Sequence, residues 1–221
     1  RVLNNMAENL IRRGDLAGTR PIYERFLRET EQVGWAGQIL WVRAQESSLR
    51  FIVGDWDEAL ATADELIAEI ESGKPHYLEA DVRGTRSAIR HARGDIAGAI
   101  ADAERAVAVS RESKDPQTVV PSLGGLATLY AREGRLDAAR AAIDEAVRVL
   151  RPLERHYYVV AILLIWATLD LDLAAEMIEI FDRGDAMDTW TKGCVAAWRG
   201  DLAAAAAVFE RFGARWPEAE M

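Results

Sequence analysis

The sequence has little of several things that commit a protein to a particular chemistry. Its 221 residues include one cysteine and three histidines. A lone cysteine, Cys194, cannot form an intramolecular disulfide, which indicates a reducing compartment and predicts a cytoplasmic protein. Basic residues are also scarce, because 27 Lys and Arg stand against 36 Asp and Glu and the formal net charge is −9. Since phosphate binding needs a basic face, we expect no direct contact with nucleic acid.

Long apolar runs are missing as well. The longest, residues 157–169, is shorter than the roughly 18 or more apolar residues that a membrane-spanning helix needs. We therefore expect a buried helix there and no membrane segment. The chain opens at Arg1 without an initiator methionine or a basic-then-apolar leader, so we interpret it as a piece of a longer protein. Half of its residues are apolar, too many for a disordered chain.

Motifs for catalysis and cofactor binding are absent from the sequence. It contains no Gly-x-x-x-x-Gly-Lys-Ser/Thr, Gly-x-Gly-x-x-Gly, Gly-x-Ser-x-Gly or His-Glu-x-x-His pattern. The histidines, His76, His91 and His156, have no second Cys or His at ligand spacing, so we expect no metal and no other cofactor. The small residues around Cys194 favour packing over a nucleophilic role. The sequence therefore predicts that the chain is not an enzyme.

What the sequence does contain is a repeat. Glycines recur every 40 residues, with a further copy near the end, at Gly14, Gly54, Gly94, Gly134 and Gly200. An Asp or Arg and then an apolar residue follow each glycine, and a small residue stands five positions after it, at Thr19, Ala59, Ala99, Ala139 and Ala205. Glycine ends a helix without a Cβ clash, and the Asp after it can cap the next helix. Each unit is therefore predicted to be two antiparallel helices joined by a tight glycine turn.

Between the glycines the apolar residues follow helical spacing. The fourth unit has one apolar face before its glycine and one after it, formed by Leu123, Leu126, Ala127, Tyr130, Ala139, Ile143, Ala146 and Leu150. No window alternates with a period of two. The pattern predicts an all-α fold, an α-α superhelix of about six antiparallel helix pairs in a single domain over residues 1–221. The approximate repeats are 1–33, 34–73, 74–114, 115–151, 152–183 and 184–217.

The spacing of these positions is that of a known repeat. The fourth unit carries it most completely, and the last unit adds Ala205, Phe209, Phe212 and Pro217. With these residues the chain resembles the tetratricopeptide repeat family, although its units have 40 residues instead of the usual ~34. The resemblance implies a solenoid that serves as a scaffold for protein binding. Units of this length look like those in helical sensor regions of large bacterial regulators, which implies signalling or transcription regulation.

Two units depart from the pattern in the same way. Repeat two carries Arg43, Glu46 and Arg50, and repeat three carries Arg83, Arg86 and Arg90, where repeat one has apolar residues. We call these six residues the arginine columns, because spacings of three, four and seven put each set on one helical face. Arginine binds carboxylate and phosphate through paired hydrogen bonds, so one interpretation is a site for an anion or an acidic peptide. The alternative is internal pairing with acids of the preceding helix, such as Glu65 and Glu69.

The apolar segment 157–169 is the second irregular feature. An amphipathic helix needs only one apolar stripe, yet this segment is apolar nearly all round. One of its faces consists of Tyr158, Ala161, Ile165 and Thr168. Two interpretations stay open, a helix enclosed by its own repeat and neighbours, or an apolar interface for a partner helix or a second copy of the chain.

These observations predict a non-catalytic protein-interaction or ligand-sensing repeat module, the regulatory part of a larger bacterial signalling or transcription-regulatory protein. The expected partner is a protein or peptide, or an effector domain of the same longer chain. The alternative function is a self-associating structural module that forms a homodimer through the helix at 157–169.

Overall fold

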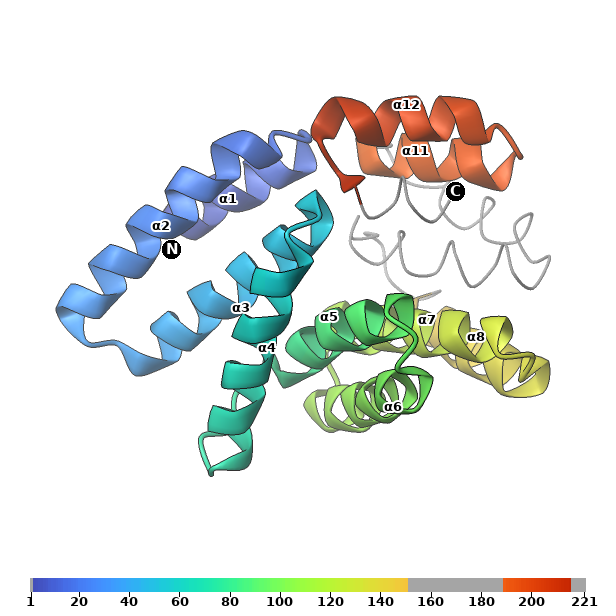
Figure 1. The fold of residues 1–221 in the computed structure, drawn as a ribbon, viewed down its shortest axis with the longest axis horizontal. Helices are drawn as coiled ribbons and strands as arrows, with labels where there is room; N and C mark the ends of the chain where they lie inside the picture. Colours follow the sequence, from blue (N-terminus) through green and yellow to red (C-terminus); the bar gives the residue numbers. More distant parts are fainter. Residues whose placement is uncertain (1, 151–188, 216–221) are drawn as a thin grey trace.

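The computed structural model describes residues 2–150 and 189–215, and within these ranges it contains ten helices and no strand. The helices are α1 (Val2–Arg12), α2 (Leu16–Val33), α3 (Ala36–Val53), α4 (Trp56–Glu71), α5 (Glu79–Ala92), α6 (Ile96–Ser113), α7 (Pro116–Arg132), α8 (Leu136–Leu150), α11 (Thr189–Trp198) and α12 (Leu202–Phe212). Consecutive helices pack on one another along the chain (Figure 1). The all-α solenoid that the glycine repeat predicted is confirmed.

The tight turns inside the helix pairs form where the glycine spacing predicted them. All five repeat glycines adopt the left-handed conformation, with φ between 72° at Gly134 and 94° at Gly54. The capping role of the following Asp is confirmed at three turns, as when the carboxylate of Asp15 accepts a hydrogen bond of 2.8 Å from the backbone N–H of Gly18. Asp55 differs, because its carboxylate instead accepts a bond of 2.6 Å from Arg20.

The small residue that follows each glycine by five positions faces the interior of the array. Thr19, Ala59, Ala99, Ala139 and Ala205 are all completely buried. A larger side chain at any of these positions would push the two helices apart, because protein interiors are packed without spare volume. The repeat therefore preserves the distance between paired helices as well as the turn between them.

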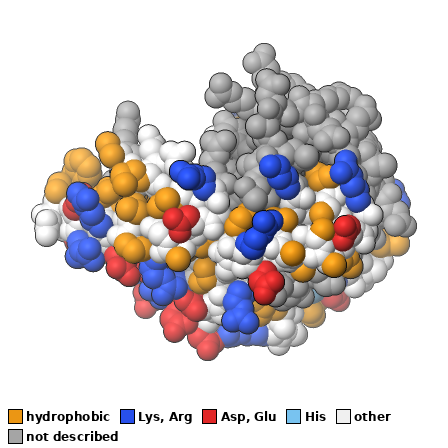
Figure 2. Space-filling view, turned by 90° about the horizontal axis from the view of Figure 1, so that it is seen from above, with side chains coloured by type: hydrophobic (Ala, Val, Ile, Leu, Met, Phe, Trp, Pro, Cys, Tyr) orange, Lys and Arg blue, Asp and Glu red, His pale blue; other side chains and the backbone are white. Residues whose placement is uncertain are grey.

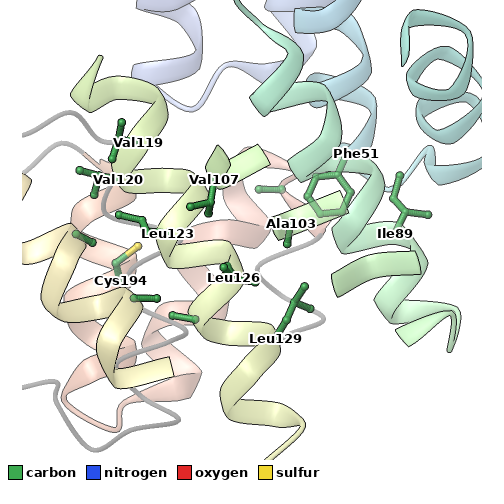
Figure 3. Close-up of a cluster of buried hydrophobic side chains, with 14 of the residues drawn as sticks. Phe51, Ile89, Ala103, Val107, Val119, Val120, Leu123, Leu126, Leu129 and Cys194 are labelled. Carbon is green, nitrogen blue, oxygen red and sulfur yellow. The ribbon is translucent and has the colours of Figure 1, made fainter. Parts of the chain in front are cut away.

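One hydrophobic cluster runs through most of the described chain. The predicted apolar faces of α7 and α8 are part of it, with Leu123, Ala139 and Leu150 almost fully buried. Figure 3 shows side chains of α7, together with Cys194 of α11, inside this cluster. A smaller cluster fills the space between α3, α4 and α5, and it consists of Ala44, Ala63, Leu66, Ile67, Leu78 and Val82.

The two ends of the described chain meet. The C-terminal end of α12 lies beside the turn that joins α1 and α2 (Figure 1), where the ring of Phe212 covers Gly14. The array therefore closes on itself between its first and last described helix pairs. Among the described helices, none combines the length and the apolar character required to cross a lipid bilayer.

Candidate functional site

The two arginine columns lie on neighbouring helices. Residues 43, 46 and 50 belong to α3, and residues 83, 86 and 90 belong to α5. α5 packs against both α4 and α6, and the guanidinium groups of Arg86 and Arg90 bond to carboxylates on each of these two helices. Arg43 bonds to α4 alone. The second column therefore bridges the second helices of repeats two and three.

Asp102 of α6 is the centre of this arrangement. Its carboxylate accepts hydrogen bonds from Arg83 (3.4 Å), from Arg86 through two nitrogens (2.7 and 2.6 Å) and from Arg90 (2.9 Å). The Asp102 side chain is only 4% exposed. Three cations thus converge on one buried anion, and this residue was not singled out from the sequence. The sequence does contain a signal for Asp102. The residues 40 positions before and after it, Thr62 and Ala142, are uncharged, so a charge at this position breaks the repeat.

Three further carboxylates pair with the same arginines and with Arg105. The four arginines at positions 83, 86, 90 and 105 bond to the four acids Asp64, Glu71, Glu79 and Asp102. The tightest of the remaining bonds joins Arg83 Nε to Glu79 at 2.8 Å, and both of these side chains are buried. We call these eight residues the Asp102 network. Asp95 adds a fifth carboxylate 3.7 Å from Arg90, so the acids around these four arginines outnumber them, and a bound anion would have to displace one of the carboxylates.

The first column is paired separately. Arg43 donates bonds of 2.7 Å to Glu65 and Glu69 of the following helix, α4, two acids that the pairing alternative expected beside the arginines of repeat three. Arg50 donates a bond of 2.6 Å to Glu46 on the same helix. All five arginines of the columns thus have a carboxylate within 4 Å. This geometry favours internal pairing, and anion binding at the columns stays a prediction.

The protonation chemistry agrees with stable ion pairs. Burial by itself lowers the pKa of Arg83 and of Arg86, but the hydrogen bonds that they donate to carboxylates, and the charge of those carboxylates, outweigh burial and raise both pKa values. The hydrogen bond from Arg43 lowers the pKa of Glu69. Arg83 and Arg86 therefore stay charged at neutral pH.

Two serines that lie 40 residues apart on the same two helices, Ser47 on α3 and Ser87 on α5, have a structural role. Ser47 Oγ donates to the carbonyl oxygen of Ala59 at 2.9 Å, and Ser87 Oγ donates to that of Ala99 at 2.8 Å. Each acceptor is the buried small residue five positions after a repeat glycine. The 40-residue recurrence of the serine is therefore explained by one bond that is made twice.

The predicted apolar interface, Tyr158, Ala161, Ile165 and Thr168, lies outside the described residues. Self-association through this face stays a prediction.

An exposed aromatic surface, which the sequence analysis did not single out, lies on the loops that join consecutive repeats, between α2 and α3 and between α4 and α5. Val33, Trp35 and Tyr77 expose 62%, 62% and 60% of their surface. His76 joins the two loops, because its Nε2 lies 3.2 Å from the carbonyl oxygen of Gly37 and its ring lies 4.7 Å from that of Tyr77. We call Val33, Trp35, His76 and Tyr77 the aromatic edge.

The His76 ring is held in one orientation. Its Nδ1 accepts from the backbone N–H of Leu78 at 3.3 Å, which leaves Nε2 as the donor to Gly37. Partial burial lowers the pKa of His76, and the bond to Gly37 only partly offsets this effect. A neutral imidazole therefore ties the loop before α5 to the start of α3. The aromatic edge is a preformed surface at neutral pH.

Other chemistry is not assembled in the part of the chain that the structure describes. No three His, Cys, Asp or Glu side chains there could hold a metal ion. Cys194 is 1% exposed inside the main cluster. On the face in Figure 2, basic and acidic side chains are interspersed, with hydrophobic ones among them. This face shows no field of a single sign.

Comparison with solved structures supports the fold through one match. The chain is similar to BtubC (BKLC) from P. vanneervenii, with a TM-score of 0.54 and 16% identity over 90% of this chain and 88% of that one. A tetratricopeptide repeat protein from Parabacteroides merdae matches with a TM-score of 0.36 and 10% identity, over 95% of this chain and 90% of that one. No protein-family model and no curated protein sequence matches. The described helix pairs with their glycine turns form a tetratricopeptide-like helical-repeat fold.

Proposed function

We propose that the chain is a non-catalytic protein-interaction module and that the aromatic edge is where its partner binds. Large exposed apolar side chains grouped together mark interaction surfaces, and Trp and Tyr dominate the binding energy of such surfaces. Trp35 and Tyr77 stand more than half exposed on adjoining loops that His76 holds together. This observation carries the proposal.

The same module is proposed to be the regulatory part of a larger bacterial signalling or transcription-regulatory protein in the cytoplasm. The resemblance to long helical units of bacterial regulators supports this assignment. The partner is then a separate protein or peptide, or an effector domain of the same longer chain. The mixed charge of the face in Figure 2 and the net charge of −9 support a protein partner over nucleic acid.

The test compares three immobilised versions of the chain in quantitative capture from its source cells. The double variant Trp35→Ala/Tyr77→Ala removes both aromatic side chains. The matched control is Leu136→Ala, since Leu136 is 50% exposed at the start of α8 and lies on a different pair of helices. We expect a protein that the wild type and the control retain and that the double variant loses. Equal recovery by all three would contradict binding at the aromatic edge.

The test needs variants that fold. Both aromatic side chains are largely exposed, so each substitution should change the free energy of unfolding by no more than about 0.5 kcal/mol. Circular dichroism melting of the three proteins checks this. Self-association, the alternative function, is distinguished by sedimentation, because a monomer has a mass of 24.5 kDa and a homodimer has twice that mass.

A further inference from the structure

The turn at Gly14 differs from its counterparts in the other repeats. Gly54, Gly94, Gly134 and Gly200 are exposed, whereas Gly14 is buried. A Cβ built on Gly14 would overlap Cδ1 of Phe212, so the aromatic ring rests directly on the glycine backbone. The same construction finds nothing within 4 Å at Gly94 or Gly134. The last described helix therefore covers the first turn of the array.

A second contact lies on the next repeat. The aliphatic carbons of Arg215 lie against Gly54, where a Cβ would be 3.4 Å from Cδ of the arginine. Between these two contacts Ala214 is completely buried, and it belongs to the same hydrophobic cluster as Leu3 of α1. Phe212 and the two residues after Gly213 thus bury the turn of repeat one and touch the turn of repeat two.

This contact is not required by the repeat architecture. In a solenoid each repeat is stabilised by its neighbours, and the ends have no reason to touch. Among the described residues, the contacts to these two turns come from one aromatic ring and one arginine stem, which is small beside the ~1,200 Å² or more of a stable protein–protein interface. A contact of this size can form and break while the stacked repeats stay folded.

We propose that Phe212, Ala214 and Arg215 form a clasp that holds the repeat array closed, and that the array opens by release of this clasp. The closed form is the one described here, with the turn at Gly14 buried and Arg215 against the turn at Gly54. In the open form both turns lose these contacts, and the first and last helix pairs separate. The clasp thereby controls access to the side of the array that the closed form encloses. It does not depend on where a partner binds.

The test uses four backbone amides in equivalent turns, of which two lie beside the clasp residues and two do not. The N–H groups of Asp15, Asp55, Asp95 and Arg135 each donate to a helix carbonyl across a repeat glycine, at 2.9, 2.9, 2.9 and 2.8 Å. Only the first two lie beside the clasp. Residue-resolved hydrogen exchange by NMR, corrected for intrinsic rates, measures the protection of each amide. In the variant Phe212→Ala we expect Asp15 and Asp55 to exchange roughly tenfold faster, with no change at the other two.

A pair of matched glycine substitutions tests the clasp by changing the residue that Phe212 contacts. Gly14→Ala and Gly134→Ala impose similar backbone strain, because φ is 77° and 72° at the two positions. Only the first inserts a methyl group into the Phe212 ring. We expect Gly14→Ala to increase the radius of gyration in small-angle X-ray scattering and Gly134→Ala to leave it unchanged.

Two outcomes would overturn the proposal. One is unchanged protection of Asp15 and Asp55 in Phe212→Ala, and the other is an identical scattering profile for the two glycine variants. The amide of Asp201, which donates to Ala196 at 3.0 Å, reports whether α11 and α12 stay paired. If Phe212→Ala unfolds this pair, Arg215→Glu replaces it, because Arg215 is exposed and lies beyond the end of α12. The same loss of protection at Asp55 is then expected.

Discussion

Replacing Asp102 by Asn tests whether the arginine columns are structural. The substitution keeps the shape of the side chain and removes the charge to which three guanidinium groups bond. Each hydrogen bond that involves a charged partner contributes about 1.5–3 kcal/mol. The sum is reduced because Arg83 keeps its bond to Glu79 and Arg86 keeps its bond to Asp64. We expect the free energy of unfolding to fall by about 3 kcal/mol.

A second variant shows what the network contributes relative to an ordinary core. At the five least exposed positions of the network, repeat four has Val119, Leu123, Leu126, Tyr130 and Ala142, so these residues can be transferred 40 positions back. The five substitutions are Glu79→Val, Arg83→Leu, Arg86→Leu, Arg90→Tyr and Asp102→Ala. Replacing a buried ionic set by packed apolar residues is often neutral or stabilising, and the remaining network charges, on Asp64, Glu71 and Arg105, are at least half exposed. We expect this variant to be at least as stable as the wild type, although it contains a substitution that is destabilising by itself.

The assay is urea denaturation followed by circular dichroism. Asp57→Asn is the matched control, because Asp57 also pairs with an arginine, Arg93, but is 86% exposed, and its loss should cost under about 1 kcal/mol. A change of less than about 0.5 kcal/mol for Asp102→Asn would refute the structural reasoning. Sulfate binding that Arg86→Ala weakens without loss of stability would then support the anion site instead.

Two further predictions concern buried groups. Burial, with a smaller contribution from the charge of Asp115, raises the pKa of Asp81 to about 7. The folded state therefore binds this proton more tightly than the unfolded state, and the stability that it adds is lost as the pH rises through 7. Thermal melting at pH 5.5 and 8 should show this loss, and Asp81→Asn should remove it, whereas equal pH dependence in both proteins would contradict it. Cys194 should not react with a thiol reagent in the native protein and should react fully in concentrated guanidinium chloride, and rapid native labelling would show that α11 is not packed as described.

The features that local sequence could predict are those fixed within one repeat. The turn at Gly134 and the buried faces of α7 and α8 depend on residues that are close in sequence, so a 40-residue period was sufficient to place them. Asp102 was missed because an acid inside a helix usually faces solvent, and its burial depends on arginines contributed by the neighbouring helix. The contact of Phe212 with Gly14 spans 198 residues. Its geometry is set by the small rotations that every repeat adds, which no single repeat encodes.

The Asp102 network also bears on the order of the repeats. The first helices of repeats one to four carry, at equivalent positions, Leu3, Arg43, Arg83 and Leu123. The array therefore changes from an apolar face to ionic faces and back. An apolar face can pack against any other apolar face, whereas a buried guanidinium must meet its carboxylate or lose several kcal/mol. Arg86 meets acids on α4 and on α6, so α5 fits only between these two helices. The ionic residues therefore contribute little net stability over an apolar core, but they prevent α5 from packing against the wrong neighbour in a chain whose repeats are otherwise alike.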